Sequence, residues 1–341
     1  MKLGVNVSYR DAGVLGREAE RLGYDLVVVP EGFRADAATV LGVVAGSTER
    51  IALASGVFQI PGRTPAMTAL TAATLNALSH GRFRLGLGVS NPDISEGWHG
   101  VPFAAPLGRT REYVEIVRRT LDGERVTYQG AHFRLPPPGC AAMPLALFAT
   151  HSEIRMPIYL AAVGPRSLEL AGEIADGWLG AFCAPGQLKE ILTRIGAGRE
   201  RIGAGLDGFE VLSGVPAVAG SDPVAAAEPL RGYFAHFMGM GDPGRNVYLK
   251  LMALMGYGAE AAAVHERMVA GDARTAAAAV PAGFIEQVSL TGPEDRIADR
   301  MLEYAESGLT TMVVSPFAET TAGRIEILGA VAEARRRAGL S

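Results

Sequence analysis

The sequence predicts a closed (β/α)8 TIM barrel, and three observations support this fold class. Short apolar runs alternate with longer stretches of helical periodicity, a pattern typical of parallel βα units. The alternation recurs at about 25–30 residues, the length of one βα step. Eight strand candidates fit within the 341 residues, which favours a closed barrel over an open doubly wound sheet. We therefore expect a single barrel domain over residues 1–341.

Each expected element follows from its local pattern. Strands are predicted where short apolar runs occur, at Leu3–Val7, Asp25–Val29, Ile51–Val57, Arg82–Val89, Pro157–Ala161, Trp178–Ala181, Phe209–Pro216 and Thr310–Val314. Helices are predicted at Val14–Leu22, Ala37–Ala45, Pro65–Leu78, Leu107–Leu121, Ser167–Ile174, Gly186–Gly196, Pro293–Ala305 and Ile325–Arg337. Gly23 and Gly81 follow two of these helices and are expected to cap their C-terminal ends.

Two segments do not fit a plain barrel, at about residues 122–155 and 225–285. The first contains Val126–Leu135, which alternates around Gln129-Gly130 and predicts a β-hairpin. The second contains several helical stretches with glycine-rich joints, which predicts a helical insertion before the last strand. Insertions after barrel strands often cover the C-terminal face, where barrel active sites lie.

The composition excludes several classes of protein. Thirty-two Lys and Arg against 36 Asp and Glu leave no basic excess for binding nucleic acid. Cys140 and Cys183 are the two cysteines, which excludes a disulfide framework and a cysteine-based zinc site. The histidines show no ligand-like spacing, so no metal is expected. Because neither a signal peptide nor an apolar run of about 18 residues occurs, we expect a cytoplasmic, soluble protein without a membrane partner.

Small and polar residues gather where the expected strands end. Those positions are Glu31, Gly32 and Phe33 after the second strand, Ser55, Gly56 and Val57 in the third, Gly88 and Ser90 in the fourth, and Ala162, Gly164, Pro165 and Arg166 after the fifth. Glycine in a strand indicates either a bulge or the close approach of a flat ligand. Backbone amides at a helix N-terminus suit a phosphate. Together these strand ends predict a broad, flat, anionic ligand.

Several long stretches resemble the luciferase-like monooxygenase superfamily. They are VVVPEGFRADAATVLGVVAGSTERIALASGV, RTPAMTALTAATLNALSHGRFRLGLGVS, EGWHGVPFAAPLGRTREYVEIVRRTL, AAVGPRSLELAGEIADGW and TGPEDRIADRMLEYAESGLTTMVVSPF. The closest resemblance is to its deazaflavin branch, the coenzyme F420-dependent oxidoreductases that include relatives of methylenetetrahydromethanopterin reductase. It implies a (β/α)8 barrel with insertions, commonly a homodimer, that holds the tricyclic ring at the C-terminal mouth.

The resemblance also implies roles for individual residues. In the deazaflavin branch the third strand carries a non-prolyl cis peptide, which would fall at Ser55–Gly56 or Gly56–Val57. The implied cofactor-binding residues are Glu31, Phe33, Ser55, Gly56, Val57, Gly88, Ser90, Ala162, Gly164, Pro165 and Arg166. Gly32 and Val89 stand where sugar-phosphate dehydrogenases of this branch have His and Glu, which argues against glucose-6-phosphate oxidation. The loop at Gln59–Gly62 argues against a pterin substrate, because it is less polar than that of the methanopterin reductases.

The first functional hypothesis is an F420-dependent oxidoreductase that reduces an activated double bond, in an enone, imine or dehydroamino acid, of a small organic substrate. Candidate proton donors are Glu31, His99 and Tyr9, in that order. Phe58, Trp98 and His99 are the candidate substrate pocket, although loop packing explains Trp98 and His99 equally well. One alternative is an FMN-dependent two-component monooxygenase. Another is a noncatalytic, cofactor-binding partner subunit, because fold alone does not fix function.

Overall fold

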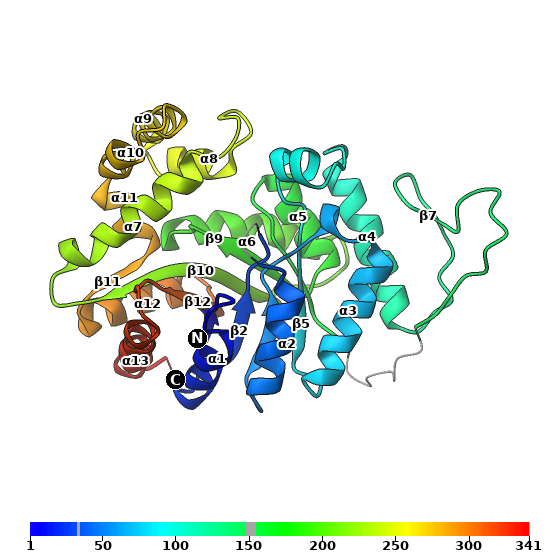
Figure 1. Cartoon of the computed structure of the whole chain (residues 1–341), viewed down its shortest axis with the longest axis horizontal. Helices are drawn as coiled ribbons and strands as arrows, with labels where there is room; N and C mark the ends of the chain where they lie inside the picture. The colour runs from blue at the N-terminus through cyan, green and yellow to red at the C-terminus, as the bar shows by residue number, and fades with distance from the viewer. Residues whose placement is uncertain (33–34, 148–154, 341) are drawn as a thin grey trace.

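The computed structural model describes residues 1–32, 35–147 and 155–340, and these form a closed (β/α)8 barrel (Figure 1). The barrel strands are β1 (Lys2–Asn6), β2 (Leu26–Val29), β3 (Ala52–Ser55), β5 (Phe83–Gly88), β8 (Ile158–Leu160), β9 (Gly177–Ala181), β10 (Glu210–Ala219) and β12 (Thr311–Pro316). They pair in parallel in this order, and β12 pairs with both β10 and β1, which closes the barrel. The predicted fold class is confirmed.

A helix follows each barrel strand on the outside. These helices are α1 (Ala12–Arg21), α2 (Ala37–Ser47), α3 (Pro65–Leu78), α4 (Pro106–Leu121), α5 (Pro165–Ile174), α6 (Pro185–Glu200), α12 (Glu294–Glu306) and α13 (Thr321–Arg337). Asp36 and Thr64 cap α2 and α3 by accepting backbone N–H bonds. Gly23 and Gly81 have φ of 80° and 85°, as their predicted capping positions require. No helix in the described part of the chain has the length and apolarity to cross a membrane.

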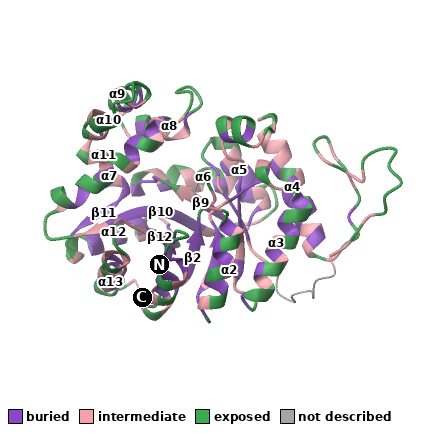
Figure 2. Cartoon of the chain, viewed as in Figure 1, coloured by how far each residue is buried: buried purple, intermediate pink, exposed green. Residues whose placement is uncertain are grey.

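The strands are buried on both faces (Figure 2). In β2, Val27 and Val29 pack toward the helices, whereas Leu26 and Val28 belong to a separate cluster with Val313 in the barrel interior. Because neither face meets water, the strands are continuous apolar runs in the sequence rather than alternating patterns. This is why the short apolar runs located the strands correctly.

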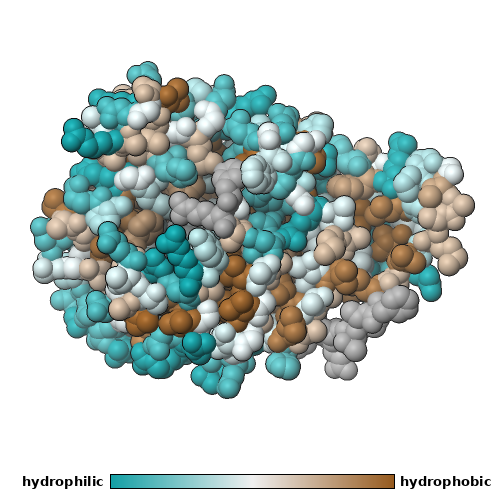
Figure 3. Space-filling model, in the orientation of Figure 1, coloured by the Kyte–Doolittle hydropathy of each residue, from teal (hydrophilic) through white to brown (hydrophobic). Residues whose placement is uncertain are grey.

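Both predicted insertions are present, and they lie at opposite ends of the molecule (Figure 1). The hairpin consists of β6 (Tyr128–Gln129) and β7 (Arg134–Leu135), so its turn lies at 130–133, later than the predicted Gln129-Gly130 centre. It belongs to an arm that protrudes from the barrel and exposes Met143 and Leu145, and hydrophobic side chains gather on this side in Figure 3.

The helical insertion follows β10. It comprises α7 (Pro223–Met238), α8 (Val247–Leu254), α9 (Gly258–Val269), α10 (Ala273–Ala279) and α11 (Ala282–Val288). The chain then forms β11 (Leu290–Gly292), an unpredicted strand that pairs with Ala217–Ala219 at the end of β10. Because β11 has only three residues, its apolar pattern is too short to identify a strand. The insertion has its own buried cluster, which includes Phe234 and Phe284.

Candidate active site

A cavity of about 2490 Å³ opens at the C-terminal ends of the barrel strands. All eight strands or the residues directly after them line it, from Asn6 in β1 to Ser315 in β12, and α7 and α8 close one side. Pockets for a single small molecule usually measure about 300–1,000 Å³, so this one has room for a large cofactor together with a substrate. The site lies at the face predicted from the sequence.

One wall of the cavity is a backbone bulge between β3 and the two-residue strand β4 (Phe58–Gln59). Its Gly56–Val57 peptide is cis, which confirms the second of the two expected positions. The Ser55 hydroxyl donates to the Gly86 carbonyl at 2.8 Å and accepts from the Gly86 N–H at 2.9 Å. Ser55 is fully buried and does not line the cavity, so it holds the bulge from behind while Gly56 and Val57 face the cavity.

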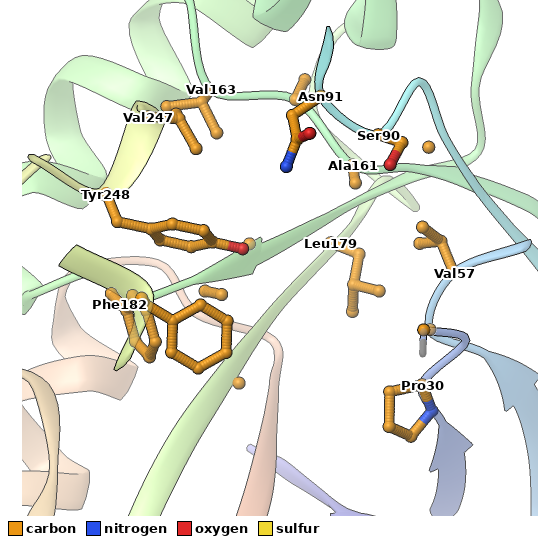
Figure 4. A pocket seen from close by; sticks show the side chains of 18 of the residues that line it. Pro30, Val57, Ser90, Asn91, Ala161, Val163, Leu179, Phe182, Val247 and Tyr248 are labelled. Carbon is orange, nitrogen blue, oxygen red and sulfur yellow. The ribbon is translucent and has the colours of Figure 1, made fainter. Parts of the chain in front are cut away.

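Three positions around this bulge require glycine, because any side chain there would clash with neighbouring atoms of the protein. A Cβ on Gly56 would lie 2.2 Å from Val28 Cγ1, and one on Gly86 would lie 1.9 Å from the Ser55 carbonyl oxygen. A Cβ on Gly88 would lie 2.5 Å from Val57 Cγ2. Glycine at these positions was expected to indicate either a bulge or the close approach of a flat ligand, and the structure contains the bulge. Ser90, which follows β5 with φ of 62°, lies at the edge of the cavity near Val57 (Figure 4).

The N-terminal end of α5 forms a second wall. Ala162, Gly164, Pro165 and Arg166 all line the cavity, as the sequence suggested. No side chain caps this helix, and the Trp178 indole donates to the Ala162 carbonyl at 2.7 Å, which fixes the preceding loop. An uncapped helix N-terminus facing a cavity is a favourable position for an anionic group.

Basic side chains outnumber acidic ones among the described residues of the cavity wall. The basic ones are Arg10, Arg166, Arg194, Arg245, Lys250 and Arg324, and the acidic ones are Glu31, Glu190 and Glu319. Part of this charge is compensated, since Arg324 pairs with Asp11 and Arg194 with Glu169. Arg166 is exposed at the cavity edge and has no ion-pair partner among the described residues. The wall therefore suits a ligand with several negative charges.

Glu31 lines the cavity, but its carboxylate is held by Arg63. Arg63 donates from Nε to Oε1 at 3.3 Å and from its terminal nitrogen to Oε2 at 2.7 Å, and it also pairs with Asp36. Glu31 accepts a further bond from the Gln59 N–H at 3.1 Å. Three N–H donors therefore occupy the carboxylate oxygens of Glu31. These contacts assign Glu31 to holding the loops after β2 and β3.

The three residues expected to form the substrate pocket do not line this cavity. Phe58 is fully buried between Phe83 and Arg63, because β4 turns its side chain into the core. His99 Nε2 lies 2.8 Å from Gln59 Oε1, so His99 packs against the outer side of the β4 loop. Trp98 is 67% exposed, because the π-helical turn Asp93–Trp98 directs it to the surface. Loop packing, the other explanation of Trp98 and His99, agrees with the contact between His99 and Gln59, whereas Trp98 is mostly exposed.

The remaining expected site residues lie at the edge of the cavity or outside the described chain. Tyr9 lines the cavity at its rim, with about half of its surface exposed, and Arg10 lies over its ring. Phe33 falls outside the described residues, so the contact expected for it beside the ring stays a prediction.

Sequence reasoning missed an aromatic wall opposite the bulge. Phe182, at the end of β9, contacts Tyr233, Phe237 and Tyr248 with ring centroids 5.1–5.6 Å apart, and Tyr233 contacts Phe317. Burial raises the pKa of the Tyr233 and Tyr248 hydroxyls, which stay neutral. The aromatic spacing in Gly232–Phe237 was a signal, but sequence alone does not show that α7 and α8 fold over the barrel mouth.

Known proteins are similar to this chain in sequence and fold over almost their whole length. A protein of Mycobacterium tuberculosis with the provisional name coenzyme F420-dependent oxidoreductase is 36% identical over 92% of this chain and 95% of its own length. The 5,10-methylenetetrahydromethanopterin reductase of Archaeoglobus fulgidus is 27% identical over 96% of this chain and 98% of its own. The structure of the F420-dependent tetrahydromethanopterin reductase of Methanopyrus kandleri superimposes with a TM-score of 0.84, at 24% identity and with 97% of each chain covered.

The family model for luciferase-like monooxygenases matches residues 2–311, nearly the whole barrel. That match includes the β3 bulge, the α5 N-terminus and most of the cavity wall. The chain belongs to the luciferase-like monooxygenase family.

Proposed function

We propose that this protein is a coenzyme F420-dependent oxidoreductase that uses the reduced cofactor to reduce an activated double bond of a small organic substrate. The observation that carries the proposal is the cavity itself. It combines a flat backbone wall at Gly56 and Val57 with an uncapped helix N-terminus and an excess of basic side chains. The M. tuberculosis relative bears the provisional name of a coenzyme F420-dependent oxidoreductase, which supports this cofactor over FMN.

The residues present fit a deazaflavin. Gly56 and Val57 would support the ring from one side, with Gly88 and Ser90 beside it. At the start of α5 the Ser167 N–H already bonds the Gly164 carbonyl, so the backbone N–H of Arg166 would hold the phosphate, and the Arg166 side chain is available for the acidic tail. When bound, the reduced cofactor supplies a hydride from C5 of its ring. The protein then has to orient the substrate, exclude water and provide one proton.

The test is a turnover assay under anaerobic conditions. Reduced F420 is mixed with the protein and with 2-cyclohexenone, a cyclic imine or a dehydroamino acid, and the return of the oxidised cofactor's absorbance is followed. We expect oxidation that depends on both protein and substrate, and a saturated product for at least one of the three. Turnover of reduced FMN with oxygen, with none of reduced F420, would contradict the proposal and support a monooxygenase.

We also propose that two copies associate as a homodimer. Val43 on α2 and Met67 and Leu70 on α3 are about half exposed, on neighbouring helices, and none of the three lines the cavity. A second copy covering this face would remove these apolar side chains from water. Sedimentation equilibrium of the purified chain should give twice the monomer mass of 35.7 kDa, and Met67→Glu should shift it to the monomer.

A further inference from the structure

The aromatic wall of the cavity holds a hydroxyl that no other part of the protein uses. Tyr248 lies at the start of α8, and its ring contacts Phe182 with centroids 5.2 Å apart and Phe237 with centroids 4.8 Å apart. Among the described residues the Tyr248 hydroxyl has no hydrogen-bond partner, and Figure 4 shows it pointing into the cavity toward Leu179. A tyrosine with a fixed ring and an unpaired hydroxyl in a cavity is prepared to bind a ligand oxygen.

The position of Tyr248 is fixed by a buried asparagine. Asn246 caps α8 by accepting from the N–H groups of Tyr248 at 2.8 Å and Leu249 at 3.2 Å. Its amide nitrogen donates to three carbonyls at the end of α7 and just after it, those of Phe237, Met238 and Met240. Because Asn246 is 6% exposed and uses all of these bonds, it ties the start of α8 to α7.

Phe182 connects this unit to the barrel. It follows β9 with φ of 53°, a backbone conformation that a bulky side chain seldom adopts, and its ring lies in the aromatic wall. Such positions persist where the surrounding structure holds them, and they gather at functional sites. Phe182 thus places the Tyr248 ring relative to the strand ends that form the rest of the cavity.

A second donor faces the same space from the other side. Asn91, which follows β5, accepts the Ile94 N–H at 2.9 Å through Oδ1, so its amide nitrogen is the free end. This nitrogen has no partner within the described residues, and Figure 4 shows it pointing into the cavity on the side facing Tyr248. Two hydrogen-bond donors and an aromatic wall match a flat ligand that carries an acceptor oxygen.

We propose that Tyr248 is the proton donor of the reduction and that, with Asn91, it selects planar conjugated carbonyl compounds as substrates. This inference rests on the proposed function. A hydride forms a new C–H bond at the β-carbon, the π electrons of the C=C bond move toward the carbonyl oxygen, and the Tyr248 hydroxyl donates its proton to that oxygen. The resulting enol rearranges to the saturated carbonyl compound, and Tyr248 regains a proton from water after the product has left the cavity.

The environment of Tyr248 agrees with this role. Burial raises the pKa of the Tyr248 hydroxyl, so the proton is present at neutral pH, although the raised pKa does not itself favour its transfer. Glu31, the first candidate from the sequence, is committed to Arg63. His99 does not line the cavity, and it contacts Gln59 instead.

A binding experiment tests this role without the cofactor. The probe is 4-(dimethylamino)cinnamaldehyde, a planar conjugated aldehyde whose absorption moves to longer wavelength when its carbonyl oxygen accepts a hydrogen bond. It is titrated into the full-length chain, the Tyr248→Phe variant and a control, Tyr257→Phe. Tyr257 lies in the same helical insertion, but its hydroxyl accepts from Gln287 and it does not line the cavity.

We expect the unchanged chain and Tyr257→Phe to bind the probe with a red shift. Tyr248→Phe should show a clearly smaller red shift, because Asn91 remains, and bind about two- to tenfold more weakly, as expected for one lost hydrogen bond beside an intact aromatic wall. An equal red shift in Tyr248→Phe, or no binding by the unchanged chain, would overturn the assignment of Tyr248.

Kinetics with reduced F420 separate this inference from the proposed function. Tyr248→Phe should lower kcat about 10²–10⁴-fold, the usual contribution of a general acid, and leave the Kd for F420 unchanged. If F420 does not bind, the proposed function fails, yet the probe experiment still decides whether Tyr248 binds a carbonyl oxygen. If F420 turns over and Tyr248→Phe keeps its kcat, the proton-donor role fails alone.

Discussion

Replacing Gly86 by alanine should deform the bulge that forms the cofactor wall. A Cβ at this position would lie 1.9 Å from the Ser55 carbonyl oxygen, whereas real Cβ contacts shorter than 3.0 Å essentially do not occur. The two backbone segments must therefore separate by about 1 Å. Overpacking costs about 1–3 kcal/mol, and the two Ser55–Gly86 hydrogen bonds contribute about 0.5–1.5 kcal/mol each. We expect Gly86→Ala to lower the free energy of unfolding by about 2–6 kcal/mol.

Urea unfolding followed by circular dichroism measures this change, with Gly42→Ala as the matched control. Gly42 lies in helix α2 with no atom near its missing Cβ, so alanine there should be neutral or stabilise by up to about 1 kcal/mol. Any folded Gly86→Ala protein should also bind F420 at least tenfold more weakly, because Val57 moves with Ser55. Equal unfolding midpoints for the two variants would refute the packing explanation of these glycines.

Three further predictions concern groups outside the cofactor wall. Burial opposes the charge of Glu20, but the N–H bonds from residues 49–51 outweigh burial and lower the pKa of this carboxyl. The stability that Glu20 contributes should therefore be complete above about pH 5 and be lost as the pH falls through and below 4.5. Glu20→Gln should lose less stability over this range, and an unchanged acid profile in the variant would contradict the prediction. Burial raises the pKa of the Cys183 thiol to about 12, whereas Cys140 is exposed. A thiol reagent should therefore label only Cys140 in the folded chain and both cysteines in urea. Rapid labelling of both cysteines in the folded chain would refute this prediction. Arg63→Met should cost about 1–3 kcal/mol, measured by urea unfolding, because it leaves partly buried Glu31 without its ion-pair partner. Adding Glu31→Gln should restore part of this stability, and no restoration would exclude the ion pair as the cause.

Most of the barrel could be predicted from the sequence because its strands are buried on both faces. A continuous apolar run such as Asp25–Val29 identifies a strand without reference to its neighbours. The small residues at strand ends also located the cavity, since Gly56, Val57, Gly88 and Ser90 all line it. The resemblance to the family supplied the position of the cis peptide, which neither spacing nor composition indicates.

The failures concern side chains whose direction depends on distant contacts. Trp98 and His99 follow a strand end, but a π-helical turn directs Trp98 outward and Gln59 binds His99 outside the cavity. Glu31 was correctly placed at the barrel mouth, yet its pairing with Arg63, 32 residues later, is a tertiary contact. Tyr248 was missed because its importance comes from the folding of α8 over the barrel.

The central claim is that the cavity is built for a deazaflavin, and the most direct test is equilibrium binding. F420 and FMN are titrated separately into the purified chain at one ionic strength, and cofactor fluorescence is followed. The account predicts micromolar or tighter binding of F420 and far weaker binding of FMN, with the F420 affinity falling as salt is added because basic side chains meet its acidic tail. Tighter binding of FMN than of F420 would contradict it.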